Sequence, residues 1–281
     1  MFRALSLLPL PVLYAGFAVV AFLIRVLGWR RDTLVDKLAR CLPDLSPSDR
    51  DAIARDFYGW LGELAAEVIH SGRIGRDALA ARMKFENPEV IRQALQDGRR
   101  VMLVAAHHCN WEWLLLRCST AFDEPLSAPY KPASWAHADE SLKSMRTRFG
   151  ATMIPADDFV QYLIKQRGHA KLLALLADQS PAATSDQQSW LPFFGQDTAF
   201  FRGPGWIGAK LGYQAFFIAV RREGRGRYAA RFVPLLAPGE RVDPDQILRA
   251  YVRALEAQVR AHPAQYFWAY NRWKRPRRLY D

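Results

Sequence analysis

Residues 107–112 read His-His-Cys-Asn-Trp-Glu and follow an apolar run, Val101–Ala106, that is typical of a buried strand. This order predicts His107 at the end of a strand and Glu112 in the first turn of the next helix, where the helix dipole favours a negative charge. We expect the two side chains to form a hydrogen bond, with Glu112 fixing the tautomer of His107 and supporting it as a general base. A general base of this kind removes a proton from a hydroxyl group. The sequence therefore predicts group transfer to an alcohol.

The same segment allows other interpretations. His108 and Glu112 are four residues apart and form a competing pair, and either histidine can be a packing residue instead. Cys109 is better explained as a buried, unreactive thiol than as a nucleophile, because no further motif of a thiol enzyme accompanies it. The chain has neither an HExxH motif nor a third paired ligand, so we expect no metal site and no cofactor.

Size and charge limit the function classes. The 281 residues are half apolar, which is ample for one large core, and the formal net charge is +11. A basic excess suits nucleic acid, an anionic membrane surface or an acidic carrier protein. The N-terminal segment makes nucleic acid the weakest of these partners.

From Ala4 to Ile24 the chain carries no formal charge. A helix of this length can cross a bilayer core of about 30 Å, although prolines would kink its first turns. Cationic residues gather after it, at Arg25, Arg30 and Arg31, which favours a cytoplasmic location for the rest of the chain. We expect a membrane anchor, spanning or re-entrant, at residues 1–30 and a cytoplasmic domain at residues 31–281. A cleaved signal peptide and a hairpin in the membrane interface are the alternatives.

Beyond residue 100 strand-like and helix-like patterns alternate. The predicted strands are Val101–Ala106, Leu126–Tyr130, Ala151–Ile154, Lys171–Ala177, Gln214–Val220 and Tyr228–Pro234; the predicted helices are Trp111–Thr120, His137–Phe149, Phe159–Gln166, Gly205–Leu211 and Asp243–Ala261. Such alternation predicts an α/β fold with a mostly parallel mixed sheet flanked by helices. Ligands of these sheets bind beyond the carboxyl ends of the strands, where His107 is expected. The segment Gln179–Gly195 is predicted to be a long loop that borders the site.

Several blocks, in this order, resemble one family. They are Leu8-Pro9-Leu10-Pro11, His107-x-x-Asn110-Trp111-Glu112, Tyr130-Lys131-Pro132, Arg146-x-Arg148-Phe149-Gly150, Asp178-Gln179-Ser180-Pro181, Pro192-Phe193-Phe194-Gly195 with Arg202-Gly203-Pro204, and Pro263-x-Gln265-Tyr266-Phe267-Trp268-x-Tyr270-Asn271-Arg272-Trp273-Lys274. Together they resemble the late (secondary, lauroyl- or myristoyl-type) lipid A biosynthesis acyltransferases, with their HX4(D/E) motif. The resemblance implies a glycerolphosphate-acyltransferase-like fold.

The resemblance also implies an activity. Members of that family work at the cytoplasmic side of the inner membrane and move a fatty acyl group from acyl carrier protein to a hydroxyl of a lipid A precursor. The resemblance implies that His107 is the base, that Glu112 is its partner and that no covalent acyl-enzyme forms. The chain lacks a GxSxG nucleophile elbow, which agrees with a direct transfer. The implied substrate-binding residues are Asn110, Lys131, Arg146, Arg148, Asp178, Gln179 and Arg202. A solvated helix end is the plain alternative for the two arginines of the Arg146 block, and a turn for Asp178.

Three further hypotheses remain open. The same chemistry suits another lipid acceptor, such as a lysophospholipid, aminolipid or glycolipid. A hydrolase would use the same base on water. A noncatalytic protein would bind anionic lipid or nucleic acid through arginine clusters at residues 221–227 and 272–278, but this leaves the segment 107–112 unexplained.

Overall fold

A seven-stranded sheet forms the centre of the computed structural model, which describes residues 5–132, 136–166, 168–181, 188–236 and 243–273. The strand order is β1-β9-β8-β2-β5-β3-β4, and every neighbouring pair is parallel except β8 with β9. The strands are β1 (Met83–Phe85), β2 (Arg100–Ala105), β3 (Leu126–Tyr130), β4 (Thr152–Pro155), β5 (Leu172–Leu176), β8 (Tyr213–Gly224) and β9 (Arg227–Pro234). The prediction of a mostly parallel mixed sheet is confirmed.

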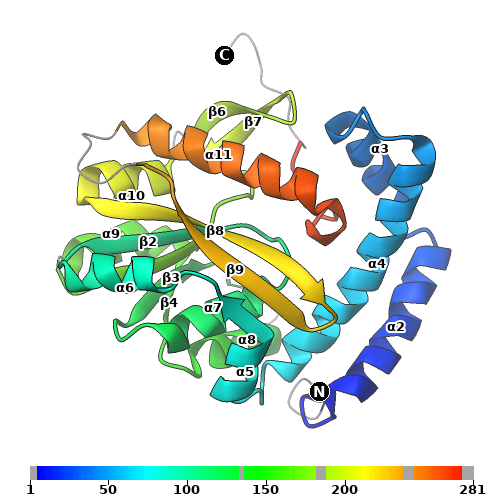
Figure 1. Cartoon of the computed structure of the whole chain (residues 1–281), viewed down its shortest axis with the longest axis horizontal. Helices are drawn as coiled ribbons and strands as arrows, with labels where there is room; N and C mark the ends of the chain where they lie inside the picture. Colours follow the sequence, from blue (N-terminus) through cyan, green and yellow to red (C-terminus); the bar gives the residue numbers. More distant parts are fainter. Residues whose placement is uncertain (1–4, 133–135, 167, 182–187, 237–242, 274–281) are drawn as a thin grey trace.

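Helices cover both faces of the sheet (Figure 1). Alternate residues of β2 enter two different cores: Met102 and Val104 pack with α9, α10 and α11, whereas Val101 and Leu103 pack with α5, α6 and α7. Burial on both faces explains why residues 101–105 of β2 are an unbroken apolar run. The described helices are α2 (Leu10–Val26), α3 (Arg31–Cys41), α4 (Pro47–His70), α5 (Arg76–Arg82), α6 (Glu89–Gln96), α7 (Trp111–Ala121), α8 (Ala136–Thr147), α9 (Phe159–Lys165), α10 (Gly203–Leu211) and α11 (Pro244–Ala261), with short 3₁₀ turns at Ala156–Asp158 and Pro263–Gln265.

The prediction of a long loop over Gln179–Gly195 is wrong in its second half, where the chain forms a strand. Strands β6 (Gln188–Phe193) and β7 (Gln196–Phe201) form a separate antiparallel hairpin, and residues 182–187 lie outside the described part of the chain. The hairpin turns at Phe194 and Gly195, which have φ of 53° and 69°. A bulky aromatic residue such as Phe194 rarely adopts a positive φ. The hairpin was not predicted because its turn contains Phe-Gly in place of the Asn-Gly or Asp-Gly pair that usually identifies such turns in a sequence. The short elements α5 and β1 were not predicted either.

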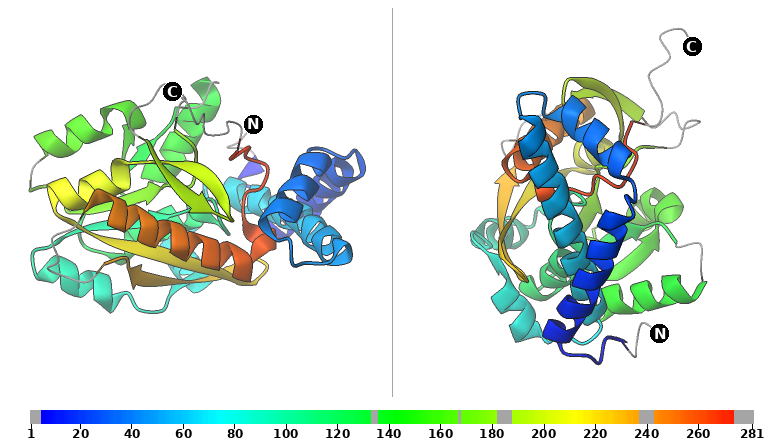
Figure 2. Two further views of the ribbon diagram at one scale, coloured as in Figure 1. Left: turned by 90° about the horizontal axis from the view of Figure 1, so that it is seen from above. Right: turned by 90° about the vertical axis from the view of Figure 1, so that its right-hand side faces the viewer.

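The N-terminal helices pack along one end of the molecule (Figures 1 and 2). Helix α2 crosses α4 closely at Gly62, where an added Cβ would come within 2.8 Å of the Phe17 carbonyl oxygen. Within the described chain no single helix has the length and apolarity of a membrane span. Helices α2 and α3 meet those limits only as a pair, which is bent by 82°.

Candidate active site

His107 lies where the sheet brings two neighbouring strand ends together. Strands β2 and β5 are parallel with Ala105 opposite Leu176, and the Ala177 amide donates to the Ala105 carbonyl at 3.2 Å. Two residues further along each strand, this register places His107 level with Asp178. The His107 Nδ1 is 2.7 Å from an Asp178 carboxylate oxygen.

The His107–Asp178 contact determines the protonation of both groups. Burial by itself lowers the pKa of His107, but the charge and hydrogen bond of Asp178, with a smaller effect of Glu112, raise it above the usual 6.5. Burial would raise the pKa of Asp178, yet the same contact holds it below 3.8. Because Nδ1–H donates to a carboxylate, Nε2 carries the lone pair that a general base requires.

The prediction of a hydrogen bond between His107 and Glu112 is wrong, because His107 is bonded to Asp178 and Glu112 to Arg146. Glu112 lies in the first turn of α7 and accepts two hydrogen bonds from Arg146 on α8, from Nε at 2.9 Å and from Nη2 at 2.5 Å. The planar guanidinium matches both carboxylate oxygens, and the His107 Nδ1 is already bonded to Asp178. Glu112 is 4% exposed whereas the Arg146 side chain is 20% exposed, so this ion pair is partly buried beside the site.

The His107 imidazole is bordered by Gln179, at its Nε2, and by two aromatic rings. The Gln179 side-chain amide lies 3.3 Å from Nε2. The Trp111 ring is 5.0 Å from the imidazole and the Phe267 ring 6.5 Å from it, measured between ring centroids. The surroundings of the imidazole thus combine a hydrogen-bonding amide with apolar rings.

The segment after α11 holds the loop that carries His107. The Phe267 amide donates to the His107 carbonyl at 3.0 Å, and the Cys109 amide donates to the Gln265 carbonyl at 2.9 Å. These bonds stabilise Cys109 at a φ of 54°, which is unusual for a residue other than glycine. The Cys109 thiol is fully buried and burial raises its pKa, as expected of an unreactive thiol.

His108 points away from the His107–Asp178 pair. Its Nε2 donates to the His262 carbonyl at 3.0 Å, and burial lowers its pKa to about 4. An imidazole that is 1% exposed and directed to a main-chain carbonyl is a packing residue. Of the two histidines, His107 has the environment of a base.

Lys37 on α3 anchors the C-terminal segment and was missed by sequence reasoning. Its Nζ donates to the carbonyls of Trp268 and Tyr270, both at 2.7 Å, and the side chain is almost fully buried. Burial lowers the pKa of Lys37 to about 8. Arg30 adds a hydrogen bond to the Ala269 carbonyl at 3.1 Å. Two cations from the N-terminal helices therefore hold the segment that supports His107.

The remaining predicted residues lie at varied places. Asn110 is buried and caps α7, its Oδ1 accepting from the Trp113 amide at 2.8 Å. Arg148 is directed through Nη1 to the carbonyls of Ser71 and Ile74, and so joins the end of α8 to the turn after α4. Lys131 and Arg202 are exposed, after β3 and before α10 respectively.

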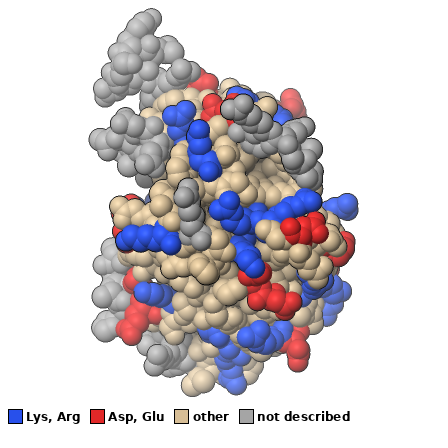
Figure 3. All heavy atoms as spheres, turned by 90° about the vertical axis from the view of Figure 1, so that its left-hand side faces the viewer, with Lys and Arg blue, Asp and Glu red and all other residues tan. Residues whose placement is uncertain are grey.

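The predicted basic cluster at residues 221–227 is largely neutralised. Arg221 pairs with Glu86 and Glu223, and both Arg222 and Arg225 pair with Glu63. Within residues 272–278 only Arg272, which is buried, and Trp273 lie in the described part of the chain. On the face at the left of Figure 1, lysines and arginines are distributed with carboxylates among them (Figure 3). These ion pairs therefore give no support to the hypothesis that the cluster binds nucleic acid or lipid by charge alone.

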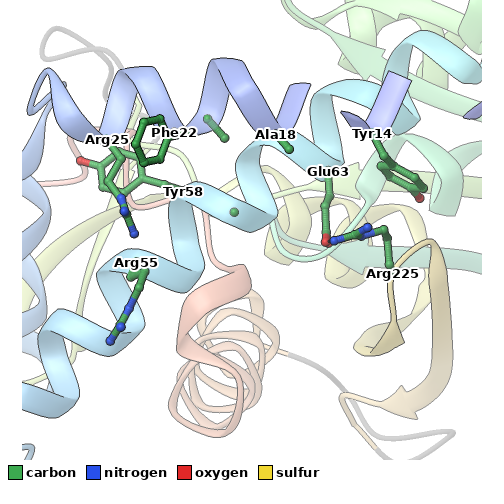
Figure 4. A pocket seen from close by; sticks show the side chains of 10 residues that line it. Tyr14, Ala18, Phe22, Arg25, Arg55, Tyr58, Glu63 and Arg225 are labelled. Carbon is green, nitrogen blue, oxygen red and sulfur yellow. The ribbon is translucent and has the colours of Figure 1, made fainter. Parts of the chain in front are cut away.

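A groove of about 270 Å³ lies between α2 and α4 (Figure 4). Its lining comes from those two helices and the β8–β9 turn, so it is built from none of the predicted site residues. In the described chain no cluster of three or more His, Cys, Asp or Glu side chains is arranged to hold a metal ion.

Comparison with known families agrees with the motifs. A family model described as bacterial lipid A biosynthesis acyltransferase matches residues 1–275, which is nearly the whole chain. No curated protein gives a significant match to the chain.

Proposed function

The chain belongs to the bacterial lipid A biosynthesis acyltransferase family and is an acyltransferase, and we propose that it moves a fatty acyl group from acyl carrier protein to a hydroxyl of a lipid A precursor. The observation that carries this proposal is the buried His107–Asp178 pair at the carboxyl ends of β2 and β5. A carboxylate at Nδ1 and a lone pair at Nε2 are what a general base for an alcohol needs.

The proposed reaction is a direct transfer. The acceptor hydroxyl gives its proton to Nε2 of His107 while its oxygen attacks the thioester carbonyl carbon. Asp178 stabilises the imidazolium that forms, as the buried aspartate does in a Ser-His-Asp triad. When the tetrahedral intermediate collapses, the carbon–sulfur bond breaks and the imidazolium returns the proton to the leaving thiolate. The hydroxyl takes the place of the Gln179 amide, which lies 3.3 Å from Nε2.

Glu112 and Arg146 act as a second unit in this proposal. Arg146 binds Glu112 through Nε and Nη2, and we propose that its Nη1 meets an oxygen of the substrate, either the developing oxyanion or a phosphate of the acceptor. Glu112 fixes the guanidinium and adds a negative potential at His107. The predicted His/Glu dyad thus becomes a His–Asp base with an adjacent Glu–Arg pair.

The membrane side of the molecule is proposed from α2. Large apolar side chains are exposed along α2 and just after it: Val12, Val19, Val20, Phe22, Leu23, Val26, Leu27 and Trp29. Exposed apolar surface of this extent is typical of a helix that enters a lipid interface, where tryptophan is favoured. We place α2 in the inner membrane and the sheet on its cytoplasmic side, where acyl carrier protein delivers its chain.

The test is an acyl-transfer assay with purified full-length protein. It would combine acyl carrier proteins of several chain lengths with a lipid A precursor, a lysophospholipid and an aminolipid, and identify the products by mass spectrometry. We expect one added acyl chain on the lipid A precursor, dependent on His107. Transfer to another lipid alone would overturn the acceptor, and hydrolysis without transfer would overturn the reaction.

A further inference from the structure

Glu67 on α4 is a fully buried carboxylate that receives side-chain hydrogen bonds from three other elements. Tyr14 of α2 donates to Oε1 at 2.8 Å, while Asn110 Nδ2 and the Tyr228 hydroxyl of β9 donate to Oε2, each at 2.7 Å. Burial raises the pKa of Glu67, and the three donors oppose that rise. Since none of these groups meets the substrate in the proposed reaction, the cost of burying the carboxylate needs another explanation.

Glu67 holds the first turn of the helix that carries Glu112. The Asn110 Oδ1 accepts from the Trp113 amide, so the Asn110 amide group must point its Nδ2 at Glu67. The Trp113 indole Nε1 donates to the main-chain carbonyl of Glu67 at 3.1 Å. The cap of α7 and its first buried aromatic residue are thus both fixed to one residue of α4.

The same carboxylate holds α2. At the crossing of α2 and α4 the helices are in close contact at Gly62, and one turn later Tyr14 reaches Glu67. Figure 4 shows the Tyr14 ring turned from α2 toward α4, beside the Arg225 side chain. The Arg225 guanidinium lies 5.4 Å from the centre of that ring. Helix α2, which has the exposed apolar side chains, is therefore linked to Glu67 by one hydrogen bond, and Glu67 is linked to Asn110 by a second.

We propose that Glu67 is a positioning residue for acyl transfer, which connects the seating of α2 on α4 to the start of α7. If α2 shifts, Tyr14 withdraws a donor from Glu67, and the Asn110 cap with Glu112 and Arg146 shifts in turn. The proposal rests on the proposed function, in which Glu112 and Arg146 border the reacting atoms.

A matched pair of variants tests the proposal. Glu67→Gln keeps the shape of the side chain but places an N–H group against donors, whereas Glu63→Gln changes a carboxylate four residues earlier on the same helix that forms ion pairs with Arg222 and Arg225. In full-length protein we expect kcat to fall about 10- to 100-fold in Glu67→Gln with KM nearly unchanged, as for a displacement of catalytic groups. Glu63→Gln should keep kcat within about twofold. Full kcat in folded Glu67→Gln would overturn the proposal.

Tyr14→Phe is the milder test and keeps the proposal testable if Glu67→Gln does not fold. It removes one hydroxyl on α2, and we expect kcat to fall about threefold to tenfold. In the Glu67→Gln background the same change should have no further effect, because both act through one connection. Independent, multiplying effects of the two substitutions would contradict the connection.

Hydrogen exchange separates failure of this inference from failure of the proposed reaction. The amides of residues 111–114 should exchange faster in Glu67→Gln than in wild type or Glu63→Gln, whichever acceptor the enzyme uses. Unchanged exchange there, together with unchanged kcat, would assign Glu67 to packing alone. Faster exchange in a protein that does not acylate a lipid A precursor would overturn the acceptor and leave the connection intact.

Discussion

The two ends of the segment 107–112 differ in how they obtain their charged partners. His107 at the strand end meets Asp178 through the register of two neighbouring parallel strands. Glu112 at the helix start meets Arg146 through the packing of α7 on α8. A motif that is continuous in sequence is thus two separately supported units. Sheet register fixes His107, the proposed base, and helix packing fixes the adjacent ion pair.

The largest effect is expected for the base itself. His107→Ala should lower kcat by about 10³-fold or more, within the usual contribution of a general base, while the protein remains folded. The measurement is the acyl-transfer rate alongside the thermal transition. His169→Ala replaces an exposed imidazole elsewhere and should be nearly silent; equal losses in both variants would contradict the assignment.

Asp178→Asn should come next, with a loss of about 10²-fold in kcat. The Asp178 charge raises the pKa of His107, so its removal lowers that pKa. Because the neutral imidazole is the active form, the acidic limb of kcat/KM should move to lower pH while the plateau falls. If the acidic limb of kcat/KM stayed at the same pH in this variant, a group other than Asp178 would determine the pKa of the base.

Glu112→Gln should cost less than Asp178→Asn, about tenfold, and should shift the acidic limb only slightly. Arg146→Lys should give a similar loss, because an ammonium cannot form the two-pronged contact with the carboxylate. A double-mutant cycle in kcat should show strong coupling between Glu112 and Arg146. Stronger coupling of Glu112 to Asp178 would erase the distinction between the two units.

Lys37→Met tests the support of the His107 side alone, and its effect on rate should be the smallest. It leaves the carbonyls of Trp268 and Tyr270 without their buried donor, which costs about 1–3 kcal/mol per group. We expect a lower midpoint of thermal unfolding and a loss of a few fold in kcat. If hydrogen exchange rose around Glu112 but not around residues 107–109, the two ends would not be supported separately.

The sequence predicted the elements better than their partners. The strand-end position of His107 and the start of α7 follow from an apolar run and a capping residue, which are local signals. Asp178 was recognised as a residue that supports the site, but its role as the partner of His107 depends on β5 lying next to β2. Neighbour order in a parallel sheet is a tertiary property, since any strand end can lie beside any other.

Two buried charges show the same limit. Glu67 follows Trp60 and Leu64 at helical spacing, so its place on the buried face of α4 was readable from the sequence. Its donors lie 43, 53 and 161 residues away, and Lys37 meets carbonyls more than 230 residues away. No local pattern identifies partners at such separations.

The bond from Lys37 to the Trp268 carbonyl has a consequence for how the enzyme is made. During synthesis the N-terminal helices leave the ribosome long before residue 268, so the loop around His107 lacks this support until that residue has been made. If α2 enters the membrane as proposed, a nascent chain meets lipid before His107 has this support. The proposed reaction would begin only once the segment after α11 has closed over the site.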